Sequence, residues 1–401
     1  MELKKYKLVE IAKIEISGVD KKIIDGELPV RLCNFVDVYY NWAITKEKAK
    51  SFMVASAKQT EIDKCSIAKG MVAITKDSET RDDIGIATYI ADDFENVLLG
   101  YHCALITPNP AIVDGKYLNA FMHTRYIQKY FENNASGSGQ RYTLSNDTIN
   151  NIPVLLPSME VQHTIGKLLA DLDRKIELNK QINDNLEAMA KQLYDYWFVQ
   201  FDFPNEEGKP YKSSGGAMVW NEKLKRELPK GWDFCFLENL LTIKNGRDHK
   251  HLADGIYPVY GSGGEMRKAS EYLYDGESVL MPRKGSLNNI MYVNEAFWTV
   301  DTMFYSEIKQ SNCAKYIYYT IKDIDFTRWN SGTGVPSMTS STLYSIKLVK
   351  PQSEILKKFD EVISPLFEHM KQISEQNSVL TKQRDELLPL LMNGQASVNS
   401  D

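Results

Sequence analysis

Two segments of the chain place basic, amide and hydroxyl side chains directly after an apolar, strand-like run. Arginine can donate two hydrogen bonds to guanine, asparagine can pair with adenine and glutamate can accept from cytosine, while lysine, serine and threonine contact phosphates or base edges. The first segment, MVAITKDSETRDDIG (71–85), offers Thr75, Lys76, Ser78, Glu79, Thr80 and Arg81. The second, VLMPRKGSLNNI (279–290), offers Arg283, Lys284, Ser286, Asn288 and Asn289. These side chains predict contact with DNA, although a solvated surface loop has a similar composition.

The two segments occupy equivalent places in the chain but carry different residues, as two different half-sites of a DNA target would require. Gln140 and Arg141, in the glycine loop GSGQRYTLS from Gly137, are further candidates for DNA contact. Their counterparts later in the chain are Val335 and Pro336, so a shared role is not expected. A turn that closes a domain onto the next helix explains this loop equally well.

These segments belong to an internal repeat, in which the best-matched runs are 194 residues apart. The strand-like run IPVLLP (152–157) is matched by IKLVKP (346–351), and each follows a glycine-bearing loop with a Ser/Thr-rich turn. Near the start of each half, LVEIAKI (8–14) resembles LENLLTI (237–243). The chain therefore reads as domain, helix, linker, domain, helix.

The two helical segments repeat apolar residues with alternating spacings of four and three, which is the pattern of a coiled-coil seam. The predicted seam positions, again offset by 194, are Ile165, Leu169, Leu172, Ile176, Asn179, Asn183 and Leu186, and then Phe359, Ile363, Leu366, Met370, Ile373, Asn377 and Leu380. Two amphipathic helices that each lie on a globular core are the alternative. Because a repeat can pair its helices within one chain only by folding back, we expect an antiparallel pair. Asn183 and Asn377 are either tolerated polar residues or the residues that set the register.

The expected fold is therefore of the α+β class, with two mixed α/β domains separated by two long helices that form an antiparallel coiled coil with pseudo-twofold symmetry. The predicted boundaries are 1–156 and 231–350 for the domains, 157–200 and 351–395 for the helices, 201–230 for a linker and 396–401 for a tail. The linker is rich in Gly, Pro, Ser and charge, and we expect it to lie outside the core.

Composition limits the classes of function that remain. The net charge of the 401 residues is −5, and the helical segments 157–200 and 351–401 sum to −2 and −3. Domains of nearly neutral charge would hold DNA weakly without a partner, since phosphate neutralisation supplies most non-specific affinity. No apolar run approaches 18 residues and the N-terminus lacks a signal peptide, so we expect no membrane span. Five scattered cysteines without CxxC spacing favour the reducing cytoplasm.

An enzyme is the main competing class, and the sequence does not favour it. No Pro-Pro dipeptide is present to grip a flipped adenine, and no Gly-Lys-Ser/Thr triplet to cradle a nucleotide phosphate. The six histidines form no metal-ligand cluster in the sequence, because only His249 and His251 are close, on a charged loop. A coiled-coil adaptor that binds only protein remains the alternative to DNA recognition, and salt-dependent DNA binding would separate the two.

Several stretches of the chain together resemble one protein family. They are TKDSETRDDIG, GSGQRYTLSNDTINNIPVLLPSMEVQHTIGKLL, LYDYWFVQFDFPNEEGKPYKSSGGAMVWN, MPRKGSLNNIMYVNEAFWTVDTMFY and RDELLPLLMNG. The glycine loop, the apolar run ending in proline, the Glu160-x-Gln162 pair and the heptads follow one another in the order of the specificity subunits of type I restriction–modification systems. The chain resembles these subunits along essentially its whole length. It departs from them at Leu356, which stands where the first half has Gln162.

The resemblance implies a DNA-binding subunit without a catalytic site, cofactor or metal of its own. Each domain would be a target-recognition domain that reads one half of a bipartite, asymmetric sequence in double-stranded DNA, and the helices would set the unread spacer. Two modification subunits would dock on the helices and adjacent domain faces, bind S-adenosylmethionine and methylate adenine N6 in each half-site. Restriction subunits, with ATP and Mg, would add translocation and cleavage.

Overall fold

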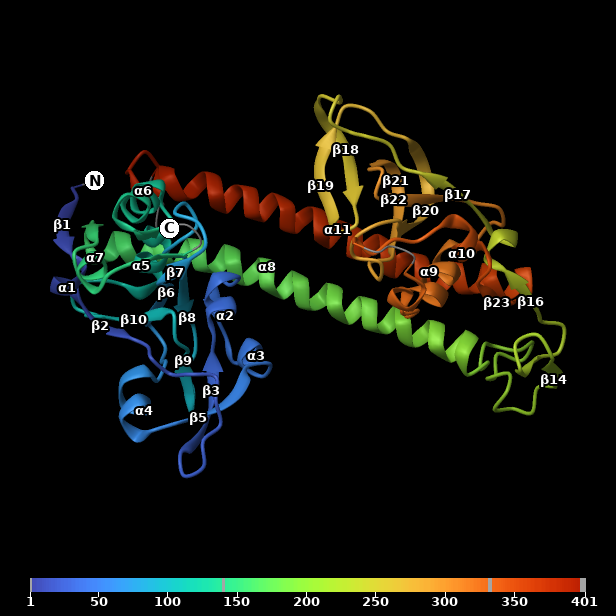
Figure 1. Cartoon of the computed structure of the whole chain (residues 1–401), viewed down its shortest axis with the longest axis horizontal. Helices are drawn as coiled ribbons and strands as arrows, with labels where there is room; N and C mark the ends of the chain where they lie inside the picture. The colour runs from blue at the N-terminus through green and yellow to red at the C-terminus, as the bar shows by residue number, and fades with distance from the viewer. Residues whose placement is uncertain (1, 139–140, 331–333, 397–401) are drawn as a thin grey trace. The chain divides into compact units, whose positions relative to one another are not determined.

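The computed structural model describes residues 2–138, 141–330 and 334–396 and divides into two compact units. Unit 1 comprises Met1–Gln181 and Ile373–Asp401, and unit 2 comprises Ile182–Gln372. Helices α8 (Met159–Tyr194) and α11 (Ser353–Met392) both cross this division. Each unit therefore contains one mixed α/β domain and a part of both long helices (Figure 1).

The domain of unit 1 is built on a five-stranded sheet in the order β2-β10-β6-β8-β4. A smaller sheet has the order β5-β3-β9. All four residues of β6 are buried, which explains why this strand has a continuous apolar run rather than an alternating one. The strands are β2 (Ala12–Ile16), β3 (Leu28–Cys33), β4 (Ala43–Ile44), β5 (Met53–Ala57), β6 (Val72–Thr75), β8 (Ala87–Ile90), β9 (Val97–Leu99) and β10 (Cys103–Pro108). The helices are α1 (Leu8–Ile11), α2 (Phe35–Tyr39), α3 (Lys46–Ala49), α4 (Gln59–Cys65), α5 (Gly115–Met122), α6 (Arg125–Asn134) and α7 (Asn146–Asn150).

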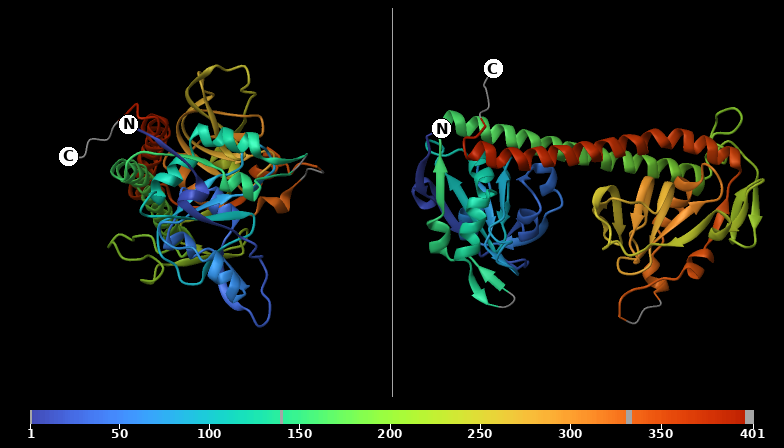
Figure 2. Two further views of the ribbon diagram at one scale, coloured as in Figure 1. Left: turned by 90° about the vertical axis from the view of Figure 1, so that its left-hand side faces the viewer. Right: turned by 90° about the horizontal axis from the view of Figure 1, so that it is seen from above.

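A three-stranded sheet in unit 1 carries the glycine loop. Strands β11 (Ser136–Ser138) and β12 (Arg141–Thr143) form a hairpin, and β12 pairs antiparallel with β7 (Asp77–Ser78). The segment after β6 is therefore bonded to the hairpin. The hairpin extends away from the α8 and α11 segments of its own unit (Figure 2).

The domain of unit 2 is built on a six-stranded sheet in the order β17-β22-β20-β21-β18-β19. It lacks a counterpart of the small β5-β3-β9 sheet among the strands that the structure describes. The strands are β17 (Leu241–Asn245), β18 (Asp254–Gly261), β19 (Gly264–Ala269), β20 (Tyr274–Pro282), β21 (Met291–Thr299) and β22 (Met303–Ile308), and the helices are α9 (Ala314–Lys322) and α10 (Ser340–Tyr344).

The two repeated runs that end in proline have the same role in both domains. In unit 1, β13 (Pro153–Leu156) pairs antiparallel with β1 (Lys4–Lys7). In unit 2, β23 (Lys347–Lys350) pairs antiparallel with β16 (Asp233–Phe236). The run thus ties the end of each domain to its first strand, directly before a long helix begins.

The segment 201–230 is more than a linker, and the expectation that it lies outside the core is wrong. Phe201, Phe203 and Leu228 are almost completely buried and belong to the main apolar cluster of unit 2. Trp232 stacks on Phe203, with ring centroids 4.9 Å apart. A hairpin of β14 (Met218–Asn221) and β15 (Arg226–Pro229) completes the segment. Its polar composition concealed the few aromatic residues that anchor it.

The long helices pair with each other inside each unit. In unit 1, Asn179 of α8 donates hydrogen bonds of 2.8 Å to Asn377 and Gln376 of α11. In unit 2, a short π-helix (Asp195–Val199) directly follows α8. Its Trp197 and Phe198 pack on Phe359 near the start of α11. The end of one helix thus lies against the start of the other, which confirms the antiparallel prediction. None of the fourteen seam positions named from the heptad pattern is exposed.

The two matched asparagines make the same contact in their own units. Asn183 donates to the backbone carbonyl of Met370 (3.4 Å), and Asn377 donates to that of Ile176 (3.3 Å). Donor and acceptor in the second bond are each offset by 194 residues from their counterparts in the first. The side-chain oxygen of Asn183 is buried without a hydrogen-bond partner among the described residues, whereas that of Asn377 accepts from Asn179.

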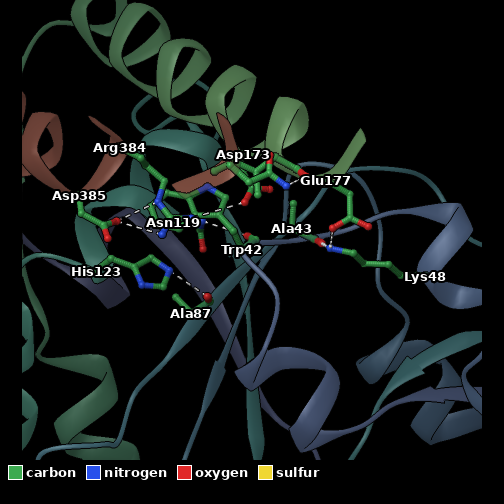
Figure 3. A network of polar contacts seen from close by, with 12 residues as sticks. Trp42, Ala43, Lys48, Ala87, Asn119, His123, Asp173, Glu177, Arg384 and Asp385 are labelled. Carbon is green, nitrogen blue, oxygen red and sulfur yellow. Dashed lines mark hydrogen bonds and ion pairs between the residues drawn. The ribbon is translucent and has the colours of Figure 1, made fainter. Parts of the chain in front are cut away.

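A network of polar contacts joins the domain of unit 1 to its helix pair (Figure 3). The Arg384 guanidinium of α11 lies over the ring of Trp42 at 4.8 Å and 3.6 Å from the Asp173 carboxylate of α8. Trp42 in turn stacks on His123, with centroids 4.3 Å apart. Lys48 pairs with Glu177 at 3.1 Å. Arg384 continues the seam four residues after Leu380 and is mostly buried, so these contacts rather than water solvate its charge.

Candidate nucleic-acid interface

Lys76 is the first residue after β6, and its backbone is fixed from both sides. Its N–H donates to the carbonyl of His102 (2.8 Å), and its carbonyl accepts from the N–H of Leu144 (2.9 Å). The predicted DNA-contacting segment, the turn before β10 and the glycine loop therefore meet at Lys76. They border a pocket of about 470 Å³ lined by Ser17, Lys76, Asp77, Tyr101, His102, Ser136, Gly137, Arg141 and Thr143.

Three charged or titratable side chains converge at this pocket. The Nη2 of Arg141 lies 2.8 Å from Nδ1 of His102 and 3.5 Å from Oδ2 of Asp77. His102 Nδ1 also makes a short hydrogen bond to Asp77. Partial burial raises the pKa of Asp77, but the hydrogen bonds from Thr143 and His102 lower it by a larger amount. The pKa of Asp77 therefore lies below the usual range. Asp77 is therefore an ionised acceptor that holds its two neighbours.

The other residues predicted from the first segment do not all face solvent. Glu79, Thr80 and Arg81 are exposed, and Ser78 is half-buried in β7. The Arg81 guanidinium lies 5.2 Å from the centre of the Tyr142 ring. Thr75 is fully buried, and its hydroxyl accepts a hydrogen bond from the Ile86 backbone (3.0 Å). The prediction that Thr75 contacts DNA is therefore wrong, because its side chain belongs to the core. Gln140 lies outside the described residues.

The second domain holds Arg283 in the same backbone geometry as Lys76. Its N–H donates to the carbonyl of Thr302 (2.8 Å), and its carbonyl accepts from the N–H of Met338 (2.9 Å). Met338 lies 194 residues after Leu144, so the repeat extends to individual hydrogen bonds. Lys284 forms a bridge with Ser337, just as Asp77 pairs with Thr143 in the first domain.

Two asparagine side chains of the second segment form hydrogen bonds that stabilise its own loop. Both polar atoms of the Asn288 amide are bonded, because Oδ1 accepts from the Phe326 backbone (2.9 Å) and Nδ2 donates to Asp325 (3.3 Å). The Asn289 amide donates to the Ser262 carbonyl (2.9 Å). Asn288, although exposed, thus takes part in holding its own loop. Lys284 and Ser286 are exposed, and Arg283 is half-buried.

Reasoning from the sequence missed Asp77, Tyr101 and His102. Asp77 lies inside the quoted first segment but was not among the residues predicted to contact DNA. His102 has a φ of +69°, in the left-handed region that residues other than glycine adopt infrequently. No pattern in the sequence indicated it, because it reaches Asp77 across 25 residues and Arg141 across 39.

The described residues also bear on other classes of site. No group of three or more His, Cys, Asp or Glu side chains in this part of the chain is arranged to hold a metal ion. No helix within the same residues combines the length and apolarity that crossing a membrane requires.

The fold and the paired loops define a class of protein. It is a chain with an internal repeat, whose two α/β domains present equivalent polar loops and alternate with the helices of an antiparallel pair. The family model described as "Type I restriction modification DNA specificity domain" matches residues 2–188 and 229–376. The chain belongs to this family, whose members provide recognition rather than catalysis.

Comparisons with individual proteins agree with this assignment. The chain is 27% identical over 322 residues to the type I restriction enzyme MjaIX specificity subunit of Methanocaldococcus jannaschii, covering 73% of this chain and 71% of that protein. It is 22% identical over 396 residues to the HindI specificity subunit of Haemophilus influenzae, covering 79% and 85%. The crystal structure of the type I S subunit from M. genitalium shares the fold, with a TM-score of 0.61, 17% identity and coverage of 100% of this chain and 97% of that one.

Proposed function

We propose that each domain of this specificity subunit reads one half of a bipartite, asymmetric DNA sequence. The observation that carries the proposal is the pair of loops at Lys76 and Arg283, which share their backbone hydrogen bonds but differ in the side chains around them. A common frame with different chemistry is what two unlike half-sites require. The lysine and arginine side chains also supply the positive charge that phosphate contacts need.

Exchange of one domain tests this proposal. Residues 231–350 of this chain would be replaced by the corresponding domain of another family member, and the chain would be expressed with its modification subunit. We expect mapping of methylated adenines to show one half of the target changed and the other half retained. A change in both halves would contradict independent recognition by the two domains.

We further propose that the paired helices set the length of the unread spacer and provide docking faces for two modification subunits. The antiparallel pairing of α8 with α11 found in each unit supports this role, and the alternating burial along both helices leaves their outer faces exposed. Insertion of one heptad into each helix preserves the seam and should lengthen the spacer. An unchanged spacer in the methylation map would exclude this role.

In this proposal the chemistry belongs to the partner subunits. S-adenosylmethionine would bind the modification subunits, which methylate adenine N6, and ATP and Mg would bind the restriction subunits. The role of this chain is to place those subunits on a chosen sequence. Transfer of a different specificity subunit to the same partners should therefore change the target without changing the product of methylation.

A further inference from the structure

Arg141 is an exposed arginine whose side chain is nevertheless held in one orientation. It begins β12, on the hairpin that extends away from the helix segments of unit 1 (Figure 2), and its side chain is 63% exposed. All its polar contacts with the described residues go through Nη2, which donates to Oδ2 of Asp77 (3.5 Å) and lies 2.8 Å from the His102 ring nitrogen that is itself bonded to Asp77. The edge formed by Nη1 and Nε has no partner among those residues. The guanidinium is thus anchored on one side and open on the other.

We propose that Arg141 is the residue with which the first domain reads a guanine, and that Asp77 and His102 are positioning residues that orient its guanidinium. The inference rests on the proposed function and names one base contact within it. Guanine presents two acceptors, O6 and N7, in the major groove, and a planar fork of N–H donors matches both at once. An arginine that is already ordered loses less side-chain entropy when it binds.

The carboxylate beside Arg141 favours a base over a phosphate as its target. Asp77 is ionised and offsets one positive charge at the pocket, which weakens the attraction for a phosphate. A guanine edge carries no net charge and depends on the direction of the donors, which the Asp77–His102 pair supplies. Lys76, at the same pocket, has a flexible side chain with a compact charge and is the better candidate for the phosphate contact.

The second domain has none of these three residues. The shared backbone bonds place Lys284 at the position of Asp77 and Thr302 at that of His102, and the 194-residue offset places Val335 at that of Arg141. A base contact that depends on Arg141 therefore belongs to one half of the target. This asymmetry makes the inference testable within a single molecule, because the other half serves as an internal reference.

The test uses the full chain in complex with its modification subunits. Methylated adenines are first mapped for the unmodified chain, which defines both halves of the target. Arg141→Ala, Arg141→Lys and Asp77→Asn are then compared by competition binding to duplexes that carry each base pair in turn at every position. Arg125→Ala is the matched control, because Arg125 lies in the same domain, is 65% exposed and pairs with a carboxylate, that of Glu132, at 2.8 Å.

We expect Arg141→Ala to reduce the preference for one G·C pair by about 10- to 100-fold in one half, with the other half unchanged. Arg141→Lys should not restore this preference, since an ammonium group cannot reproduce the planar fork. Asp77→Asn should reduce the same preference without weakening binding to non-target DNA, because it removes a negative charge. A purely structural defect would lower binding to all sequences and the melting temperature together.

Three results would overturn the inference while leaving the proposed function intact. They are an unchanged target in all three variants, a loss of affinity that is uniform over sequences and is rescued by Arg141→Lys, and an altered preference in the half read by the second domain. The second of these would identify a phosphate contact. By contrast, the absence of any bipartite target for the unmodified chain would contradict the proposed function itself.

Discussion

The two units join their domain to the long helices at corresponding places but by different physical means. In unit 1, Gly166 of α8 lies against the start of α5, where an added Cβ would stand 2.8 Å from both the Tyr117 amide nitrogen and the Asp114 carboxylate. In unit 2 the equivalent residue is Asp360 of α11, which pairs with Lys315 at the start of α9 (2.9 Å). Lys315 also pairs with Glu277 (2.7 Å), and its side chain is only 5% exposed.

A second pair of equivalent residues, one in each junction, shows the same difference between the two units. Gln162 of unit 1 is buried, accepts from the Asp114 N–H (3.0 Å) and donates to the carbonyls of Pro157 and Ile112. Its equivalent in unit 2, Leu356, is equally buried but packs in the apolar cluster. Close backbone approach with a hydrogen-bonded amide thus holds one domain, and a buried cation between two carboxylates holds the other. The first junction depends on size and the second on charge.

The largest effect should come from removal of the buried cation in unit 2. Lys315→Met leaves Glu277 and Asp360 facing each other without compensation, which should cost about 3–5 kcal/mol of local stability. Hydrogen exchange of α9 would measure the loss. Lys371→Ala, which breaks a 3.0 Å pair with Glu295 that is more exposed, is the control and should cost at most about 1 kcal/mol. Equal effects of the two substitutions would contradict the distinction between them.

A second difference between the units should appear as pH falls. Burial, and then the Arg384 charge, lower the pKa of His123 in unit 1 to about 4. The unfolded chain binds this proton near pH 6.5, whereas the folded chain binds it only near pH 4. The contribution of neutral His123 to the free energy of unfolding is therefore fully present above about pH 6.5 and declines toward pH 4. The decline should amount to about 2–3 kcal/mol.

Comparison with His123→Gln isolates this contribution, because glutamine does not titrate. Denaturant unfolding of both proteins between pH 7 and 4 should give parallel curves above pH 6.5 and a difference that narrows below it. His163→Gln, on an exposed part of α8, is the control. The assignment fails if the difference between the original chain and His123→Gln is independent of pH.

The smallest effect expected is that of a single methyl group at the junction of unit 1. Gly166→Ala should destabilise this unit by about 1–3 kcal/mol, since the backbone of α5 must move to admit the Cβ. Gly18→Ala adds the same group where nothing lies within 4 Å, and should change stability by much less. Thermal unfolding would separate the two variants, and similar shifts would show that close approach at Gly166 is not what holds the domain.

The elements that follow a local pattern could be predicted from the sequence. The alternating spacing of apolar residues along α8 and α11 predicted the helix pair, because burial along a helix repeats with the helix itself. The runs IPVLLP and IKLVKP became β13 and β23 at equivalent positions. The segment 201–230 could not be predicted correctly, since three buried side chains in a polar stretch leave no periodic signal.

The candidate interface was predictable only in part. The sequence by itself determined that two equivalent loops with unlike side chains exist, because the repeat preserves the strand before each loop. The tertiary structure alone decided that Thr75 is buried, that Asn288 holds its own loop and that Arg141 meets Asp77 and His102. The physical reason is that side-chain burial and hydrogen bonding depend on strands paired across tens of residues, which no local spacing records.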